Sequence, residues 1–497
     1  MKNIKKITLL LFVLPLVTLA QWIQVGDDID GEVMNDQSGT SVALNATGNI
    51  VAIGTPFNDD NGSRSGYVRV FINQSGEWEK IGADINGNLS NSNSGYSVSI
   101  SNDGTIVAIG APDADANGFE SGHVRIFENI AGNWMQIGDD IVGEAFSDHS
   151  GFSVSLSGDG TTVAIGAPDN EGSDGGNPGQ VRVYENQAGS WVQIGEDIDG
   201  EVAEDNSGFS LALSDNGAVV AIGAPFNDGT DMDAGQVRIY KNEAGSWEQV
   251  GDDIDGEAMN DRFGTSVALS SDGTIVAIGA RDNNSIGHVR VLQNQSENWI
   301  QIGNDIDGES IGDRFGSSVS LSEDGTIVAI GAPFNNAAGS EKGRVKLYKN
   351  QSGSWTQIDM SIDGEHVGDR FGTSVSLSAD GSIVAIGAPL NDDSGSNSGH
   401  ARIVSNSNIL SVEATTFGTD FHIYPNPTSS LVTLVMSASY PSVDVIINDT
   451  MGKKILSKNY TNTDTIHIST ENFAQGVYYI NIYNSNTILG TFKLIKE

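Results

Sequence analysis

The side chains with the clearest chemistry in this sequence are oxygen donors at alternate positions of one short segment. Asp113, Asp115 and Asn117, followed by Gly118, match the front half of a calcium-loop pattern, in which carboxylates alternate and a glycine allows the sharp turn. The bidentate glutamate that closes such a loop is missing, since that position is Val124. Asp, Asn and Gly are also the usual residues of solvated turns. The segment therefore predicts either a set of Ca²⁺ ligands or, more simply, an ordinary turn.

A basic residue recurs at one position through the middle of the chain, inside runs of the Val-Arg-Val type. Its copies are Arg69, Arg125, Arg182, Arg238, Arg290, Lys346 and Arg402. They are seven of only 17 Lys and Arg residues between positions 22 and 405, so their placement is not chance. Two interpretations are open: a ligand-binding ring, or a structural ion pair with an acidic neighbour from the same or the next repeat. We favour the ion pair, because a repeated unit also repeats its structural contacts.

Nucleophilic catalysis has no candidate in this sequence. The chain contains no cysteine, and no nucleophile stands out beside a base and a third, orienting group. Three of the seven histidines, His123, His288 and His400, share one position that other repeats fill with Tyr, Gln or Arg, which indicates a tolerant surface position. Hydrolysis by paired carboxylates stays open in so acidic a chain, although no pair stands out from the repeated background. We expect a protein that is not an enzyme.

The elements that must position these residues follow from a ladder of tryptophans. Successive tryptophans stand 56, 56, 57, 56, 52 and 56 residues apart: Trp22, Trp78, Trp134, Trp191, Trp247, Trp299 and Trp355. Such a fixed period is the signature of a repeat architecture. Each unit holds four short β-branched or apolar runs bounded by Gly, Asp, Asn and Ser, without helical periodicity. Four strands per unit, repeated seven times, predict an all-β, seven-bladed β-propeller over residues 21–405.

The phase of the repeat predicts how the ring closes. We name the strands of a blade a (Phe-Gly-x-Ser-Val), b (Ile-Val-Ala-Ile-Gly-Ala), c (Val-Arg-Val) and d (the tryptophan strand). The first d strand is residues 22–25, whereas the last repeat ends on a c strand at residues 400–405. Residues 22–25 should therefore complete the last blade, so that the N-terminal strand closes the ring. The a-to-b and c-to-d turns then share one face, and the long, acidic b-to-c and d-to-a segments share the other, which we call the loop face.

A carboxylate also recurs in the d-to-a segments. It stands three residues before the glycine of strand a, at Asp36, Asp148, Asp205, Asp261, Asp313 and Asp369. Ser92 breaks the series in the second blade. One active site does not need six copies of a residue, so we expect these aspartates to be structural.

At two positions of the unit the sequence resembles a known family. Phe-Gly begins strand a at Phe263, Phe315 and Phe371, and Gly-Ala-Pro ends strand b in five blades. Both features resemble the FG-GAP repeat, which builds the propellers of integrin α-chains and of many bacterial surface proteins. The first four blades depart by having Ser-Gly, and the fifth has Arg281 where the others have proline. Integrin-like blades often carry calcium between strands a and b, but here that link is a bare turn with too few oxygens for Ca²⁺.

Charge and the N-terminal segment limit the partners. The 497 residues carry a formal net charge of −40, and residues 22–405 hold 58 acidic side chains, so nucleic acids and anionic membrane surfaces are repelled. Lysines at positions 2, 5 and 6 precede an apolar run at 7–19 and small residues near 20, which predicts a signal peptide over residues 1–20. A retained N-terminal anchor is the alternative. After removal of the signal, we expect no transmembrane span.

The composition changes after residue 405. Residues 406–420 have the character of a linker, and alternating runs predict a small β-sandwich over 421–497. The marked positions are Tyr424, Pro425, Asn426 and Pro427, a turn ending at Gly452, then Gly476 and Tyr478, and a terminal Phe-Lys-Leu-Ile-Lys. In this order they resemble the type A C-terminal sorting domain of the type IX secretion system. The resemblance implies that this machinery is a partner, that the chain crosses the outer membrane, and that the domain is removed, with the propeller released or tethered. An ordinary β-sandwich binding module is the alternative.

These features together predict a secreted or surface-displayed propeller that binds an extracellular protein or glycan. Adhesion through the acidic loop face is the first hypothesis, and it predicts binding that depends on a cation such as Ca²⁺. A glycan-binding module that helps to capture polysaccharide is the second, and it predicts aromatic residues on the loop face. The main ones in the loops are Phe57, Phe119, Phe226 and Phe334. A hydrolase is the least favoured alternative.

Overall fold

The computed structural model describes residues 22–172, 176–336 and 340–406 and, in the C-terminal part, 421–424, 431–440, 442–449, 453–461, 463–470, 473–474, 476–484 and 487–496. The chain divides into two compact units, Met1–Leu410 and Ser411–Glu497. The predicted signal peptide, most of the predicted linker, Pro425 to Pro427 and Gly452 lie outside the described residues.

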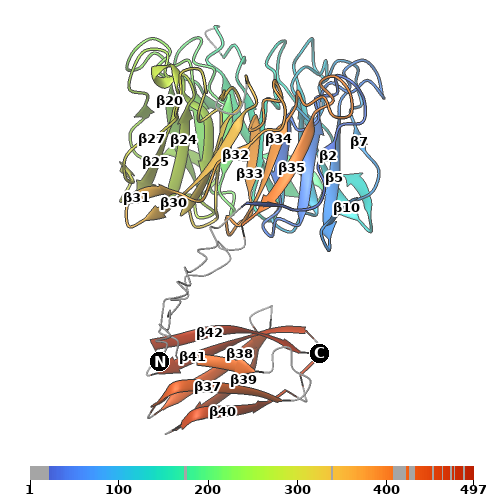
Figure 1. Ribbon diagram of the computed structural model, residues 1–497. Helices are drawn as coiled ribbons and strands as arrows, with labels where there is room; N and C mark the ends of the chain where they lie inside the picture. The colour runs from blue at the N-terminus through green and yellow to red at the C-terminus, as the bar shows by residue number, and fades with distance from the viewer. Residues whose placement is uncertain are drawn as a thin grey trace, which may run out of the picture. The chain divides into compact units, whose positions relative to one another are not determined.

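The first unit is a ring of seven antiparallel sheets, which confirms the seven-bladed propeller (Figure 1). The innermost strands a are β3 (Ser41–Leu44), β8 (Ser97–Ile100), β13 (Ser153–Leu156), β18 (Ser210–Leu213), β23 (Phe263–Leu269), β28 (Ser318–Leu321) and β33 (Ser374–Leu377). Strands b are β4 (Ile50–Thr55), β9 (Ile106–Ala111), β14 (Thr162–Ala167), β19 (Val219–Ala224), β24 (Ile275–Ala280), β29 (Ile327–Ala332) and β34 (Ile383–Ala388). Blades are numbered 1 to 7 in this order.

The outer half of each blade holds strand c, strand d and a two-residue strand that also pairs with c. Strands c are β5 (Tyr67–Gln74), β10 (His123–Ile130), β15 (Gln180–Gln187), β20 (Gln236–Glu243), β25 (His288–Asn294), β30 (Arg344–Gln351) and β35 (His400–Ser405). Strands d are β6 (Glu77–Lys80), β11 (Asn133–Gln136), β16 (Ser190–Gln193), β21 (Ser246–Gln249), β26 (Trp299–Gln301), β31 (Ser354–Gln357) and β1 (Ile23–Gln24). The short strands are β7 (Ile85–Asn86), β12 (Ile141–Val142), β17 (Ile198–Asp199), β22 (Ile254–Asp255), β27 (Ile306–Asp307), β32 (Ile362–Asp363) and β2 (Ile29–Asp30).

The hydrophobic core lies between blades, because strand b is apolar on both faces and each face packs on a neighbouring sheet. One cluster joins Val42 and Ile53 of blade 1 to Ala385 and Ile403 of blade 7. The glycine near the end of strand b allows this approach. A Cβ at Gly110 would lie 2.0 Å from the carbonyl oxygen of Gly151 in the next blade. The small residues of the Ala-Ile-Gly-Ala run therefore set the distance between sheets.

A closed circle of hydrogen bonds joins the seven inner strands. The serine at or just inside the start of strand a donates its hydroxyl to the carbonyl oxygen of the strand-a glycine in the next blade, at 2.7–2.9 Å. The pairs are Ser41–Gly95, Ser97–Gly151, Ser153–Gly208, Ser210–Gly264, Ser266–Gly316, Ser318–Gly372 and Ser374–Gly39. Since the last pair joins blade 7 to blade 1, the circle has no gap.

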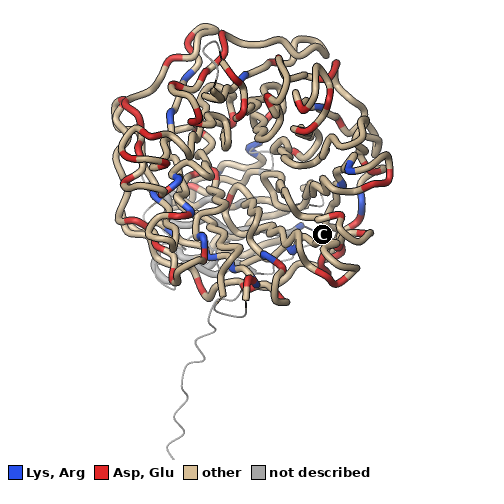
Figure 2. The backbone as a smooth tube through the Cα atoms, turned by 90° about the horizontal axis from the view of Figure 1, so that it is seen from above, with Lys and Arg blue, Asp and Glu red and all other residues tan. Residues whose placement is uncertain are grey.

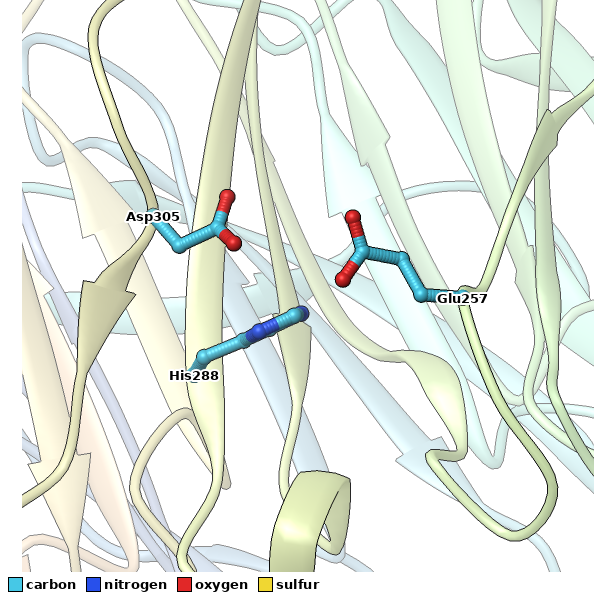
Figure 3. A group of neighbouring side chains, drawn as sticks. All are labelled: Glu257, His288 and Asp305. Atoms are coloured by element: carbon cyan, nitrogen blue, oxygen red, sulfur yellow. The ribbon is translucent and has the colours of Figure 1, made fainter.

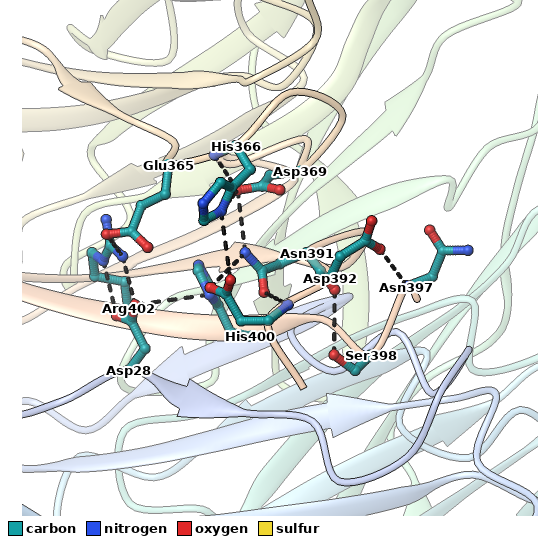
Figure 4. Close-up of polar contacts among 11 residues, drawn as sticks. Asp28, Glu365, His366, Asp369, Asn391, Asp392, Asn397, Ser398, His400 and Arg402 are labelled. Carbon is teal, nitrogen blue, oxygen red and sulfur yellow. Dashed lines mark hydrogen bonds and ion pairs between the residues drawn. The ribbon is translucent and has the colours of Figure 1, made fainter. Parts of the chain in front are cut away.

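The N-terminal strand closes the ring as predicted. β1 pairs with β35 in the last blade, with Ile23 opposite Ser405 and Gln24 opposite Val404. β2 also pairs with β35, with Ile29 opposite Ala401. Asp28 then accepts hydrogen bonds from Nε and Nη2 of Arg402 at 2.8 and 2.5 Å, so a buried ion pair fastens the two ends (Figure 4).

The tryptophans connect neighbouring blades through hydrogen bonds of their indole groups. Each one therefore stabilises the contact between two blades as well as its own blade. Each indole N–H donates to a backbone carbonyl at the end of the preceding d strand, at 2.7–3.0 Å. The pairs are Trp78–Val25, Trp134–Ile81, Trp191–Ile137, Trp247–Ile194, Trp299–Val250 and Trp355–Ile302. The exception is Trp22, whose indole nitrogen is buried without a partner.

The second unit holds two small sheets, as a small sandwich requires. One contains β36 (Phe421–Tyr424), β37 (Leu431–Tyr440) and β40 (Thr463–Ser469), and the other β38 (Val443–Asp449), β39 (Lys454–Tyr460), β41 (Gly476–Asn484) and β42 (Thr487–Lys496). A single apolar cluster of their inward residues, including Val432, Val445 and Ile480, forms the core. Of the predicted sorting residues, Tyr424 ends β36, Gly476 begins β41 with φ +151°, and Tyr478 is buried with its hydroxyl donating to the Ala474 carbonyl at 2.8 Å.

Candidate functional site

The predicted calcium ligands lie in one b-to-c loop of blade 2, where each has a protein partner. Asp113 accepts a hydrogen bond from the amide of Asn93, and Asp115 accepts one from the backbone N–H of Glu120 at 2.9 Å. The Asn117 amide donates to two carbonyls of the next d-to-a segment, at 3.1 and 2.9 Å. These contacts are those of a hydrogen-bonded turn. Calcium binding by Asp113, Asp115 and Asn117 stays a prediction.

The recurring basic residue of strand c forms the expected ion pair with an acidic neighbour. Its partner is the glutamate that ends the preceding Asp-Ile-Asp-Gly-Glu segment, so the pair spans two blades. The pairs are Arg69–Glu32, Arg182–Glu144, Arg238–Glu201, Arg290–Glu257, Lys346–Glu309 and Arg402–Glu365, at 2.5–3.7 Å. In blade 2 the position of that glutamate holds Asn88, so Arg125 has no carboxylate there; it donates to the Asn86 carbonyl at 2.7 Å. This position is structural.

The recurring aspartate of the d-to-a segments is structural as well. In blade 4, Asp205 is buried and accepts from the backbone N–H of Val202 and from the amide of Asn227 in the b-to-c loop, both at 3.0 Å. Four other blades have the same Asp–Asn pair. In blade 2 both partners change together, to Ser92 and Ala114. The paired change shows that the two residues serve one contact between loops.

The expectation that His123, His288 and His400 share a surface position is wrong. They are 0, 2 and 0% exposed, because the d-to-a segments on either side cover the start of strand c. Burial lowers the pKa of all three, to about 4 for His123. Among the described residues, no group forms a hydrogen bond with either ring nitrogen of His123 or His400. Nδ1 of His400 lies 3.8 Å from the Asp28 carboxylate.

The open grooves between blades belong to the repeat. Cavities of about 510, 300 and 330 Å³ recur at equivalent places, each lined by a d-to-a segment together with the Tyr and Trp of the following blade. Because the same groove is built by the same residues in several blades, it carries no distinguishing feature of this chain.

The centre of the loop face is different, because residues from opposite sides of the ring line one cavity there. This cavity of about 330 Å³ includes Tyr96 of blade 2, Arg281 of blade 5, Arg314 and Phe334 of blade 6 and Arg370 of blade 7. Blade 1 contributes Gln37, Thr40 and Phe57 to the wall of this cavity. We call this opening the central mouth. It lies inside a rim on which acidic residues gather (Figure 2).

An aromatic arc begins at the central mouth, where Tyr96 lines the cavity, and continues beyond it. Tyr96, Phe152 and Phe209 each follow the strand-a glycine of their blade, so they stand at the loop-face end of the innermost strands. Neighbouring ring centroids lie 5.0 and 4.9 Å apart, with planes tilted by 46°. Phe209 also contacts Phe226, edge to face at 6.3 Å. All four side chains are partly exposed, so they offer an apolar surface to a ligand.

The opposite arc is basic. Arg262, Arg281 and Arg314 surround the single carboxylate of Asp282, with N–O distances of 3.4, 3.4 and 3.6 Å. The pKa of Arg281 is lowered, chiefly by burial and further by the neighbouring guanidiniums of Arg262 and Arg314. Three guanidinium groups around one carboxylate leave an excess of positive charge, which an anionic ligand would neutralise.

Cation–π contacts place the arginines of the basic arc against aromatic rings. The Arg262 guanidinium lies 5.1 Å from the centroid of Phe226, and Arg314 and Arg370 lie 4.4 and 4.6 Å from that of Phe334. Arg370 also pairs with the Glu341 carboxylate at 3.3 Å. These contacts hold each guanidinium over an aromatic ring. A guanidinium held in place can bind a carboxylate or sulfate through two parallel hydrogen bonds.

His149 stands at the position of blade 3 that is equivalent to Arg262, Arg314 and Arg370, on the side of the aromatic arc. Its Nδ1 lies 2.8 Å from Asp169, and Glu120 lies 3.5 Å from its Nε2. The hydrogen bond to Asp169 raises the pKa of His149. This residue therefore gains positive charge as the pH falls.

Sequence reasoning missed the central mouth. The two positions that line it, before and after the Ser-Gly or Phe-Gly pair, vary from blade to blade, and the repeat drew attention to what is constant. One signal was available, because Arg281 was already noted as the departure from Gly-Ala-Pro. Of the loop phenylalanines predicted from the sequence, Phe57 and Phe334 line the mouth. Phe226 contacts Phe209 of the aromatic arc, and Phe119 stacks on Phe146.

Comparison with known families finds two matches. Residues 422–497 match the secretion system C-terminal sorting domain, and residues 306–348 and 362–403 match the FG-GAP repeat. No curated protein matches the chain. No helix among the described residues is long and apolar enough to cross a membrane.

Solved structures give distant similarities. A proposed 6-phosphogluconolactonase from Bacteroides uniformis is 13% identical, with 66% of this chain and 86% of that chain covered and a TM-score of 0.47. A second, from Bacteroides fragilis, is 14% identical, with 66% and 85% covered and a TM-score of 0.45. Raptor from Chaetomium thermophilum is 13% identical, with 78% and 29% covered and a TM-score of 0.49.

Proposed function

We propose a binding function for this chain, which is an FG-GAP repeat propeller followed by a type IX secretion C-terminal sorting domain and is exported to the cell surface or the extracellular space. The proposed ligand is an oligosaccharide that carries a carboxylate or sulfate group, and the proposed site is the central mouth. Adhesion to a surface that displays such a glycan is the use that export suggests. We further propose that the protein acts by binding alone, without catalysis.

The arrangement of Arg262, Arg281 and Arg314 around Asp282 carries this proposal. Guanidinium groups bind carboxylates and sulfates through parallel hydrogen bonds, and partial burial strengthens such bonds. The aromatic arc on the other side of the cavity offers flat apolar faces on which a sugar ring can stack. A cavity of about 330 Å³ is of the size that small ligands occupy.

The overall charge narrows the ligand class. A chain with a net charge of −40 repels a polyanion before it reaches the mouth. A mostly neutral saccharide with an isolated acidic group avoids this repulsion and still meets the basic arc. We therefore expect sparsely charged glycans to bind better than heavily sulfated ones.

Cation-dependent adhesion to a protein is the alternative, and one experiment separates the two. The secreted protein is applied to an array of neutral, singly acidic and polyanionic glycans, with Ca²⁺ and with a chelator. R314N is the test variant, because asparagine stands at the equivalent positions 93 and 206. K241Q is the control, because Lys241 is exposed on an outer strand and its loss changes the net charge equally.

Loss of one charge-assisted contact in a partly buried site costs about 1.5–3 kcal/mol, so R314N should weaken binding by roughly 10- to 100-fold. K241Q should bind like the parent protein, and a chelator should have no effect. Equal binding by R314N and its parent would refute the site. Binding to proteins alone, abolished by the chelator, would favour the alternative.

A further inference from the structure

Blade 5 contains a group of three potential metal ligands outside the central mouth. Glu257 comes from the d-to-a segment before the blade, His288 begins strand c, and Asp305 lies in the d-to-a segment after it. Their ligand atoms all lie within 4.8 Å of one another. In Figure 3 the two carboxylates face each other above the edge of the imidazole, so that the three groups converge on one space.

His288 points to a ligand that the protein itself does not supply. The side chain is 98% buried, as its exposed fraction is 2%, and no described residue forms a hydrogen bond with its ring nitrogens. A buried polar group without a partner costs free energy, so such groups are usually satisfied by water, an ion or a ligand.

The same three positions in blade 7 show how the protein can satisfy such a group without a metal. There Arg402 contacts both carboxylates, Asp28 at 2.5 Å and Glu365 at 2.6 Å, next to His400 (Figure 4). The guanidinium occupies the place where a cation would neutralise the pair.

Blade 5 lacks this neutralisation. Arg290, the counterpart of Arg402, reaches Glu257 only at 3.7 Å, donates to the Asp255 carbonyl and lies 4.0 Å from the centroid of the Phe263 ring. Asp305 is left with the amide of Gln301 at 2.7 Å. The Asp305 carboxylate therefore has no cationic side chain against it within ion-pair distance among the described residues.

The other blades lack the full set. Blade 2 has a histidine but Asn88 in place of the glutamate, blades 3 and 4 have Gln180 and Gln236, blade 1 has Tyr67, and blade 6 has Arg344. At these three equivalent positions, within the described structure, blade 5 alone combines histidine, glutamate and aspartate without an arginine that contacts both carboxylates. A second group, Glu365, His366 and Asp393, lies elsewhere, in blade 7, and all three of its residues are exposed.

The site is also open to solvent. A shallow cavity of about 520 Å³ is lined by Glu257, Gln301, Asp305 and Asp307. An ion can enter from this side, and a water molecule can complete its coordination. The ligand atoms of the three residues lie within 4.8 Å of one another, about an ångström farther apart than ligands that bind one metal at about 2.0–2.2 Å. The half-exposed Glu257 side chain is free to move by this distance.

We propose that blade 5 binds one Zn²⁺-class divalent ion through an imidazole nitrogen of His288 and the carboxylates of Glu257 and Asp305, with water in the remaining position. One nitrogen and two carboxylate ligands suit zinc better than calcium, which prefers six to eight oxygens. Arg290 stays beside Glu257 and sets an upper limit on the affinity. This inference does not depend on the proposed glycan site.

The test uses the secreted chain, purified without a histidine tag, titrated with Zn²⁺ by calorimetry in about 1 mM Ca²⁺ so that weak carboxylate sites are already occupied. Co²⁺ is titrated in parallel and its visible absorption recorded. H288Q is the test variant. Glutamine is native at this position in blades 3 and 4, where Gln236 is buried and reaches Asp255, so the variant should fold.

The matched controls are E201Q, which removes the equivalent glutamate of blade 4, and H400Q, which removes the equivalent histidine of blade 7. The parent chain, E201Q and H400Q should each bind one Zn²⁺ and give the intense Co²⁺ band of a site with few ligands. H288Q and D305N should lose at least about tenfold in affinity and lose the band. Equal Zn²⁺ binding by H288Q, or no binding by the parent chain at millimolar Zn²⁺, would overturn the proposal.

Discussion

Deletion of residues 22–26 tests whether the N-terminal strand holds the ring together. The deletion removes the β1–β35 ladder, the hydrogen bond from the Val25 N–H to the Ile403 carbonyl at 2.9 Å, and the acceptor of the Trp78 indole N–H at 2.7 Å. It also removes Trp22, which packs on the core between blades 6 and 7. Blade 7 is left with an open edge.

The size of the effect follows from these contacts. About four hydrogen bonds at roughly 1 kcal/mol each, and a largely buried indole at about 2 kcal/mol, amount to about 6 kcal/mol. A propeller of nearly 390 residues unfolds with an entropy of about 0.8 kcal/mol/K, at about 2.1 cal/mol/K per residue. The deletion should therefore lower the Tm of the propeller by about 7 °C.

The assay is thermal unfolding of the deleted and full-length secreted chains, followed by circular dichroism. A double variant, I23C with S405C, is the matched control, because the two residues face each other in the ladder and the chain has no other cysteine. Its single disulfide would close a loop of nearly the whole propeller and stabilise it by on the order of 5 kcal/mol, reversibly on reduction. An unchanged Tm after the deletion, or cysteines that do not cross-link, would refute the closure.

Three further predictions concern buried polar groups. The pKa of His123 is about 4 in the folded state, below its unfolded value, so neutral His123 contributes its full stability above about pH 6.5. As the pH falls toward 4, the free energy of unfolding should decrease by up to about 3 kcal/mol. H123Q should flatten the dependence of Tm on pH in this range; parallel Tm curves for H123Q and the parent protein would contradict the low pKa. N227A should cost about 1–3 kcal/mol in urea unfolding, because it removes one of the two hydrogen bonds to the same buried carboxylate oxygen of Asp205. The double change D205S/N227A copies blade 2 and should recover most of this loss; no recovery would show that the two residues do not act as one unit. W134F should cost about 1 kcal/mol by removing the hydrogen bond to the Ile81 carbonyl, and an unchanged urea midpoint would argue against a link between blades.

Features copied into every blade were predictable from sequence alone. The four strands and the ion pairs of strand c each occur in several blades, so repetition excluded a chance similarity. The pairing of Ile23 with Ser405 follows from the phase of the repeat, which ends one strand short. Such inferences need no knowledge of distances, because each blade must bury the same strands against the next.

The positions of the three strand-c histidines could not be predicted in the same way. Variation among Tyr, Gln, His and Arg suggested exposure, yet His123 and His400 are fully buried. The cover comes from d-to-a segments of two different repeats, which the local pattern does not describe. Residue types vary there because each blade fills a polar pocket with a different side chain.

The central mouth escaped prediction for the opposite reason. Its aromatic arc occupies one position of the unit, but only Tyr96, Phe152 and Phe209 are aromatic there, and the basic arc begins where these end. A comparison of the repeats that looks for shared residues does not detect a position at which the residue type varies. The ring brings its seven variants to one cavity, where the differences between blades become the walls of a single site.

Blade 5 concentrates these differences. Its strands a, b and c lie within the one interval of 52 residues in the tryptophan ladder. Its strand a is lengthened across a register shift between Phe263 and Ser266, and a short 3-10 turn at Asn283–Ser285 replaces the longer b-to-c loop. The same blade supplies Arg281 to the central mouth and His288 to the proposed metal site. Because the remaining blades maintain the ring, one blade can change its loops and polar residues at little cost to the fold, and the function of a repeat protein is best sought in the copy that departs furthest from the others.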